Sequence, residues 1–140
     1  MAARTARLLI LSDIQGHWPA LEAVLAAEPK CDAVVFCSDV VDYGPRPVEC
    51  LRWVMQNATH TVRGNHDNAL GFGVDYQYVG TFREYSFATR DLHRTLLSEA
   101  ERKSLHGLPT LEWFAWLGKH FRVARDTPQG DLFEYLNPDQ

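Results

Sequence analysis

The sequence has no long apolar run, few cysteines and no excess of positive charge, and each of these absences excludes a class of protein. The apolar run nearest the amino terminus, Leu8–Leu11, is too short for a signal-peptide core or a membrane span. The net charge of -4 argues against broad electrostatic binding to nucleic acid, although it leaves room for a local basic patch. We therefore expect a cytoplasmic protein that is neither membrane-bound nor a general nucleic-acid binder.

The three cysteines, Cys31, Cys37 and Cys50, are odd in number and lack the spacing of metal ligands. Cys37 falls inside an apolar run, so we expect buried, reduced thiols rather than a disulfide or a catalytic cysteine. The chain shows no internal repeat, low-complexity tract or linker. With 140 residues it fits one domain, residues 1–140, that is long enough to bury a hydrophobic core.

The first half of the sequence alternates apolar strands with amphipathic helices. Continuous apolar runs predict buried strands over Ala6–Ser12 and Ala33–Cys37, and a run rich in Thr and Val predicts a third over Ala58–Arg63. Apolar residues at helical spacing predict one helix from Trp18 onward and a second from Val48 onward. The order β-α-β-α-β implies a parallel sheet with right-handed crossovers, and hence an α/β fold.

The second half changes character and predicts helices followed by a hairpin. We expect a helix over Thr81–Leu97 and a shorter helix introduced by a capping box at Ser98 and Glu101. Alternating apolar residues on either side of a Gly-Lys turn predict a hairpin over Leu111–Arg125. Because large side chains lie on both faces of this hairpin, both faces need cover.

Three polar motifs directly follow the three predicted strands: Ser12–His17, Ser38–Pro45 and Gly64–Asn68. The carboxyl ends of parallel strands lie along one edge of a sheet, where ligands of open α/β sheets usually bind. We therefore expect the three motifs to converge on one site. The alternative is that their Asp and Asn residues serve as turn and helix-cap residues, which these residue types favour.

The residue types in these motifs are typical of a divalent-cation site. Asp13, Asp39 and Asn65 offer oxygen ligands, which suit Mg²⁺, Mn²⁺ or Fe²⁺ better than a soft ion. A carboxylate between two strand ends can bridge two cations about 4 Å apart, which together activate a water and hold a phosphoryl oxygen. His66 is then the expected proton donor to a phosphate oxygen, and Asp67 is the residue expected to orient His66.

Two of these stretches, Asp39-Val-Val-Asp-Tyr-Gly-Pro and Gly64-Asn65-His66-Asp67-Asn68, resemble motifs of the calcineurin-like metallophosphoesterase family, in particular its small prokaryotic phosphodiesterase branch. The resemblance implies a β-sandwich flanked by helices and metal-dependent hydrolysis of a phosphate ester, in the first place a phosphodiester. It implies that Asp39 bridges two metals, that Asp13 and Asn65 bind one each, and that His66 assists at the phosphate. Mn²⁺ is the first ion expected, with Mg²⁺, Fe²⁺, Ni²⁺ or Zn²⁺ as alternatives.

The sequence departs from the family pattern at several site positions. Gln15 stands where the family has a histidine, Ser38 where it has a glycine, and Arg125 where it has another histidine. Gln15 is therefore expected as a weak fourth metal ligand. Arg125 is expected to face a cation at Asn65, where its charge would oppose the metal or replace it in holding an anion. We expect one or two metal ions per chain at weakened occupancy, and at most one that is well held.

The family's last motif, Gly-His-x-His, does not occur before the chain stops at Gln140. This stop implies an incomplete second sheet, so the Leu111–Arg125 hairpin is expected to have an open edge and to form a homodimer. Two functions stay open. A metal-dependent phosphoesterase is favoured by the intact Gly64–Asn68 motif, whereas the altered positions favour a weakened or inactive relative that binds a phosphate ligand or a protein.

Overall fold

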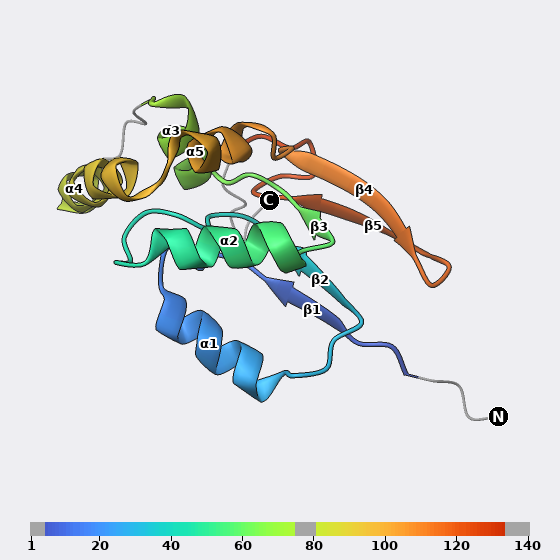
Figure 1. Ribbon diagram of the computed structural model, residues 1–140. Coiled ribbons are helices and arrows are strands. Elements are labelled where there is room, and N and C mark those ends of the chain that lie inside the picture. The colour runs from blue at the N-terminus through green and yellow to red at the C-terminus, as the bar shows by residue number, and fades with distance from the viewer. Residues whose placement is uncertain (1–4, 75–80, 134–140) are drawn as a thin grey trace.

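Figure 1 shows the chain as a computed structural model in which residues 5–74 and 81–133 are described. The first half forms a three-stranded parallel sheet in the order β1-β2-β3. Its elements are β1 (Leu8–Leu11), α1 (Trp18–Ala27), β2 (Ala33–Phe36), α2 (Pro47–Asn57) and β3 (His60–Thr61). The predicted β-α-β-α-β order and the parallel sheet are confirmed.

Adjacent residues of β2 belong to two different hydrophobic clusters. Phe36 is completely buried in a cluster that includes Leu51 of α2. Val35 packs instead with Val62 and Val123, the latter from the carboxyl-terminal hairpin. Because successive side chains of a strand point to opposite faces, helices cover one face of the sheet and the hairpin covers the other. The chain is therefore a layered α/β structure, as predicted.

Three further helices follow the sheet in sequence: α3 (Asn65–Phe72), α4 (Thr81–Leu96) and α5 (Glu99–His106). The capping box predicted before α5 is present. Ser98 Oγ accepts the Glu101 N–H, and the Glu101 carboxylate accepts the Ser98 N–H. Figure 1 shows α3 and α5 side by side, at the end of the sheet where the three polar motifs lie.

The third strand is shorter than predicted, and the motif that follows it is helical. Strand β3 ends at Thr61, and the Gly64–Asn68 motif forms the first turn of α3. Arg63 leaves the sheet because its N–H donates to a carbonyl oxygen of the segment before the hairpin. Asp67 accepts the Gly64 N–H at 3.1 Å and so caps the helix. These hydrogen bonds of Arg63 and Asp67 accompany the end of the strand before the motif.

The predicted hairpin is present as β4 (Leu111–Trp116) and β5 (Lys119–Ala124), which pair antiparallel. Figure 1 shows it alongside β3. Phe114 stacks on His60 with ring centroids 3.7 Å apart. The Glu112 carboxylate contacts His60 Nδ1 at 2.7 Å and accepts the Thr61 N–H at 3.0 Å. The hairpin is therefore fixed against the parallel sheet by both apolar and polar contacts.

The second sheet has two strands within the described residues. Phe114 is covered by His60 and by Phe121, whereas Trp113 is 62% exposed. The expected homodimer through this hairpin stays a prediction. Cys31, Cys37 and Cys50 are free thiols, and Cys50 alone is fully buried. No helix of residues 5–74 and 81–133 is both long enough and apolar enough to cross a membrane.

Candidate functional site

The loops that follow β1 and β2 are joined to each other by backbone hydrogen bonds. Asp13 N–H donates to the Ser38 carbonyl oxygen at 2.9 Å, and Gln15 N–H donates to the Asp39 carbonyl oxygen at 2.9 Å. The amino end of α3 joins them, because the His66 N–H donates to Asp39 Oδ1 at 3.0 Å. The structure thus places the three motifs at one edge of the sheet.

The backbone of these loops is strained. Non-glycine residues with positive φ are uncommon, and in proteins they gather at functional sites. Of the seven in the described residues, six lie here: Asp13 (52°), Gln15 (46°), Ser38 (122°), Asp39 (54°), Asp42 (74°) and Tyr43 (57°). The close approach of the loops also requires glycine at position 64. A Cβ atom on Gly64 would lie 1.9 Å from Asp39 Oδ1.

Asp67 is a structural acid at the centre of these loops. It is completely buried, and its carboxylate accepts the backbone N–H groups of Asp39 and Val40 at 2.8 Å, of Val41 at 3.3 Å and of Gly64 at 3.1 Å. Burial raises its pKa, in opposition to these hydrogen bonds. Asp67 therefore shapes the loop that carries Asp39, which is a different role from the predicted one of orienting His66.

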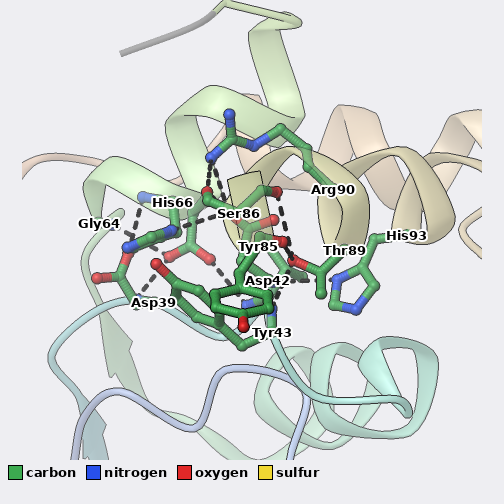
Figure 2. A network of polar contacts seen from close by, with 12 residues as sticks. Asp39, Asp42, Tyr43, Gly64, His66, Tyr85, Ser86, Thr89, Arg90 and His93 are labelled. Carbon is green, nitrogen blue, oxygen red and sulfur yellow. Dashed lines mark hydrogen bonds and ion pairs between the residues drawn. The ribbon is translucent and has the colours of Figure 1, made fainter. Parts of the chain in front are cut away.

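The carboxylate that contacts His66 Nδ1 belongs to Asp42, at 2.8 Å. Figure 2 shows that α4 supplies two more groups to this carboxylate. Arg90 Nη2 donates to Asp42 Oδ2 at 2.8 Å and to Ser86 Oγ at 2.7 Å, and Ser86 Oγ lies 3.3 Å from the same Asp42 oxygen. Burial acts to raise the pKa of Asp42, but the hydrogen bonds and charges of His66 and Arg90 outweigh it and lower the pKa.

Helix α4 also supports the backbone of the loop after β2. His93 Nδ1 accepts the Asp42 N–H at 3.0 Å, and its Nε2 contacts the Gly44 carbonyl oxygen at 2.6 Å. Thr89 Oγ1 accepts the Tyr43 N–H at 3.2 Å. Burial lowers the pKa of His93, which favours its neutral form. This face of the helix was not among the predicted site residues. Its signal in the sequence is a set of polar residues spaced three and four apart: Ser86, Thr89, Arg90 and His93.

Arg125, at the end of β5, lies on the carboxylates of the first two loops. Its Nη1 contacts Asp39 Oδ2, Ser38 Oγ at 3.1 Å and Asp13 Oδ1 at 3.4 Å, while Nε contacts Asp126 Oδ1 at 3.1 Å. Burial acts to lower the pKa of Arg125, but the neighbouring carboxylates outweigh it and raise the pKa, so the guanidinium stays charged. The prediction placed Arg125 beside a cation at Asn65, whereas its contacts are with Asp13 and Asp39.

The calcineurin-like phosphoesterase pattern matches residues 6–135 of the 140 residues. The chain belongs to the calcineurin-like phosphoesterase family. Membership supports a phosphoesterase function, and enzymes of this family use divalent metals.

The chain is similar to several individual proteins. An uncharacterised protein of Methanocaldococcus jannaschii is 29% identical over 135 residues, which are 94% of this chain and 54% of that protein. A metallophosphoesterase structure from Sphaerobacter thermophilus has a TM-score of 0.75 and 29% identity, over 95% of this chain and 52% of the other. A hypothetical protein from Pyrococcus horikoshii OT3 has a TM-score of 0.77 at 17% identity, over 97% and 61%. The chain thus spans little more than half the length of these relatives.

The residues at this family site do not fit a divalent metal as the structure places them. Asp13 and Asp39 direct oxygens to one point, but Arg125 Nη1 lies at that point. No group of three His, Cys, Asp or Glu residues within the described residues converges as a metal site. Gln15, the expected fourth ligand, lines a groove of about 600 Å³ beside Asp13. Asn65 is buried at the first position of α3. The metal ligands Asp13, Gln15, Asp39 and Asn65 therefore stay a prediction, and the position of Arg125 argues against them.

Asp39 is a second buried acid of the site whose pKa is raised. It is completely buried, and burial raises its pKa to about 7 with a further contribution from the charge of Asp67, while His66 and Arg125 act to lower it. The pKa shift shows that the charge of Arg125 only partly offsets the cost of burying this carboxylate. The cation that lies beside Asp39 in this structure is Arg125.

Proposed function

We propose that this domain binds phosphate esters at the carboxyl edge of the β1-β2-β3 sheet, with Arg125, His66 and the amino end of α3 as the contacting groups. The observation that carries the proposal is the guanidinium of Arg125. Nη1 and Nε are engaged by carboxylates, but Nη2 has no hydrogen-bond partner among the described residues. The side chain is 14% exposed. The site therefore contains a charged donor that is fixed through its other two nitrogens.

A guanidinium is well suited to a phosphate oxygen because it is planar, always charged and weakly hydrated. Asp13 and Asp39 hold the plane of the Arg125 guanidinium, so little side-chain entropy is lost when Nη2 donates to a ligand. The same carboxylates neutralise part of its charge. We therefore expect moderate affinity that falls as the salt concentration rises.

The amino end of α3 and His66 complete the proposed phosphate contacts. A helix amino terminus carries partial positive charge and attracts anions. His66 lies at the second position of α3, and its Nδ1 is fixed by Asp42 at 2.8 Å. A ring held through Nδ1 would contact a phosphate oxygen through Nε2. Asp39 and Asp67 already accept two of the N–H groups at this helix end, so His66 and Arg125 are the main proposed contacts of the anion.

The groove beside Asp13 offers space for the organic part of the ester. Ile14, Leu21, Val24 and Tyr43 line it together with other apolar side chains of the first two loops and α1. Its volume of about 600 Å³ suits a group of the size of an aromatic ring system. We therefore propose phosphodiesters with an aromatic substituent as the first ligands to test.

Titration calorimetry with bis(4-nitrophenyl) phosphate, in the presence of a chelator, tests the binding proposal. We expect wild-type protein to bind and Arg125→Gln to bind about tenfold more weakly or worse, the usual scale for loss of a charge-assisted hydrogen bond. Arg122→Gln is the matched control, because Arg122 lies on the same strand and stacks over Trp113, away from the site. Equal affinity in wild type and Arg125→Gln would reject the proposal.

Hydrolysis is the second candidate function, and the contact between Asp42 and His66 favours it. A buried carboxylate that fixes an imidazole is a common arrangement for a residue that transfers a proton. Release of 4-nitrophenol from the same diester, with and without Mn²⁺, decides between the two functions. Release that is lost in both Asp39→Ala and His66→Asn would assign hydrolysis. Binding without release in the wild type would assign the binding function alone.

A further inference from the structure

We propose that Arg125 is a built-in cation that keeps divalent metal ions off Asp13 and Asp39. The inference concerns competition for these two carboxylates, and it holds whether or not a phosphate ester binds. Its test is a metal titration without ester, so it can fail while the binding proposal stands, and the reverse also applies.

Three oxygens converge on Nη1 of Arg125. Asp13 Oδ1, Ser38 Oγ and Asp39 Oδ2 all lie within hydrogen-bonding or ion-pair reach of Arg125 Nη1. Carboxylate and hydroxyl oxygens are the donors that hard divalent cations take, at roughly 2.0–2.6 Å. A metal bound to both carboxylates would need the space that Nη1 occupies. Arg125 and a metal ion therefore exclude each other.

The hairpin that carries Arg125 is held in place independently of these carboxylates. Val123, two residues before it, packs against Val35 and Val62 under the sheet. The paired strand β4 is fixed to β3 through Glu112 and the stacked rings of Phe114 and His60. Arg125 Nε also contacts Asp126. The guanidinium is thus delivered to the site by a folded hairpin, at a high effective concentration that a metal ion in solution must overcome.

Few other ligand atoms remain near Asp13 and Asp39 to bind a metal ion. Apart from Asp13 and Asp39, the other expected ligands are the neutral amides of Gln15 and Asn65. Asp67 lies near Asp39, but its carboxylate accepts four backbone N–H groups. Two carboxylates and neutral oxygens make a weak site for a transition-metal ion, and a resident positive charge weakens it further by direct repulsion.

Calorimetric titration of the full chain with Mn²⁺ tests the inference, beside Arg125→Gln and the control Arg122→Gln. We expect weak or undetectable binding by wild type and by Arg122→Gln. Arg125→Gln is expected to bind Mn²⁺ at least about tenfold more tightly, because it removes a unit charge in contact with the ion position. Adding Asp39→Asn to Arg125→Gln should abolish the gain, which would locate the ion at this carboxylate.

A second variant separates the effect of the charge of residue 125 on Mn²⁺ affinity from the effect of its side-chain shape. Arg125→Lys keeps a positive charge and is expected to bind Mn²⁺ about as weakly as wild type. Circular dichroism spectra that match wild type establish that each variant is folded. The inference is overturned if folded Arg125→Gln gains no affinity, or if Arg125→Lys binds as tightly as Arg125→Gln. Tight Mn²⁺ binding by wild type overturns it without any variant.

Discussion

Arg90→Met removes the positive partner of a carboxylate that has no access to solvent. Asp42 is 0% exposed and Arg90 is 1% exposed, and Arg90 Nη2 donates to Asp42 Oδ2 at 2.8 Å. Methionine fills a similar volume, so the change deletes the charge and the hydrogen bonds rather than the packing. His66 and Ser86 still contact Asp42 in the variant. The carboxylate therefore loses its arginine partner and keeps two weaker partners.

The expected loss in free energy of unfolding follows from the burial of the pair. Breaking a buried ion pair by removing one partner costs about 3–5 kcal/mol. Because His66 and Ser86 remain, we expect the lower end of this range, about 3 kcal/mol. For a domain of this size each kcal/mol lowers the melting temperature by roughly 3 °C, so the melting temperature should fall by about 10 °C.

Urea and thermal unfolding, followed by circular dichroism, measure this loss directly. Arg94→Met is the matched control, because Arg94 lies one turn further along α4 and pairs with Asp91 at the surface, 3.1 Å away. It should change stability by no more than about 0.5 kcal/mol. The double variant Asp42→Asn with Arg90→Met should cost less than the sum of the single changes. A loss in free energy of unfolding below about 1 kcal/mol in Arg90→Met would refute the view that buried Asp42 depends on the charge of Arg90.

Three further predictions concern the strained loop, acid titration and assembly. Ser38→Gly should raise the melting temperature, because φ of 122° at Ser38 is strained for any residue but glycine, and relief of such strain is worth about 1 kcal/mol; a lower melting temperature would show that the Ser38 contact with Arg125 matters more. Between its ordinary value of 3.8 and its raised pKa of about 7, folded Asp39 keeps a proton that the unfolded chain has lost. Stability should therefore fall as pH rises through this window and level off above it, and Asp39→Asn should flatten the slope of unfolding free energy against pH; an unchanged slope would contradict the raised pKa. Light scattering at micromolar concentration should give the mass of a homodimer formed through the exposed Trp113 face, and a monomer mass would reject the dimer.

The sheet and its strand order were predictable because apolar runs, and the polar motifs and prolines between them, are strong signals in the first half. Leu8–Leu11 and Ala33–Phe36 are short apolar runs that end at polar motifs, and Pro19 and Pro47 lie in the first turns of the helices that follow. The hairpin was equally predictable, since apolar residues alternate with other residues in both strands on either side of a turn. These features depend on residues close in sequence, so a single sequence contains them.

The roles within the site were less predictable because they depend on contacts between distant segments. The sequence paired His66 with its neighbour Asp67, but the fold turns Asp67 toward the backbone of the loop after β2 and brings Asp42 to the imidazole. Arg90 lies 48 residues from Asp42 in the chain. The spacing of polar residues marks its face of α4, but it does not identify Asp42 as the partner of Arg90. Only the packing of α4 against the loop assigns it a partner.

The contacts of Arg125 were also only partly predictable from the sequence. The family resemblance implied that Arg125 faces the site, and the structure places it there. Which carboxylates it meets depends on the angle between the hairpin and the parallel sheet. That angle is set by Val123 and by the stack of Phe114 on His60. Sequence patterns do not determine such angles. The sequence therefore predicted that Arg125 lies beside Asn65, whereas in the structure it contacts Asp13 and Asp39.

A crystal structure of the wild-type chain grown with both Mn²⁺ and phosphate tests the central claim most directly. Anomalous scattering locates manganese without ambiguity, and phosphate stands for the ester. The account predicts a phosphate oxygen on Arg125 Nη2 and no anomalous peak between Asp13 and Asp39, with the guanidinium still in contact with both. A manganese peak at that point, with Arg125 turned away from the carboxylates, would contradict the account.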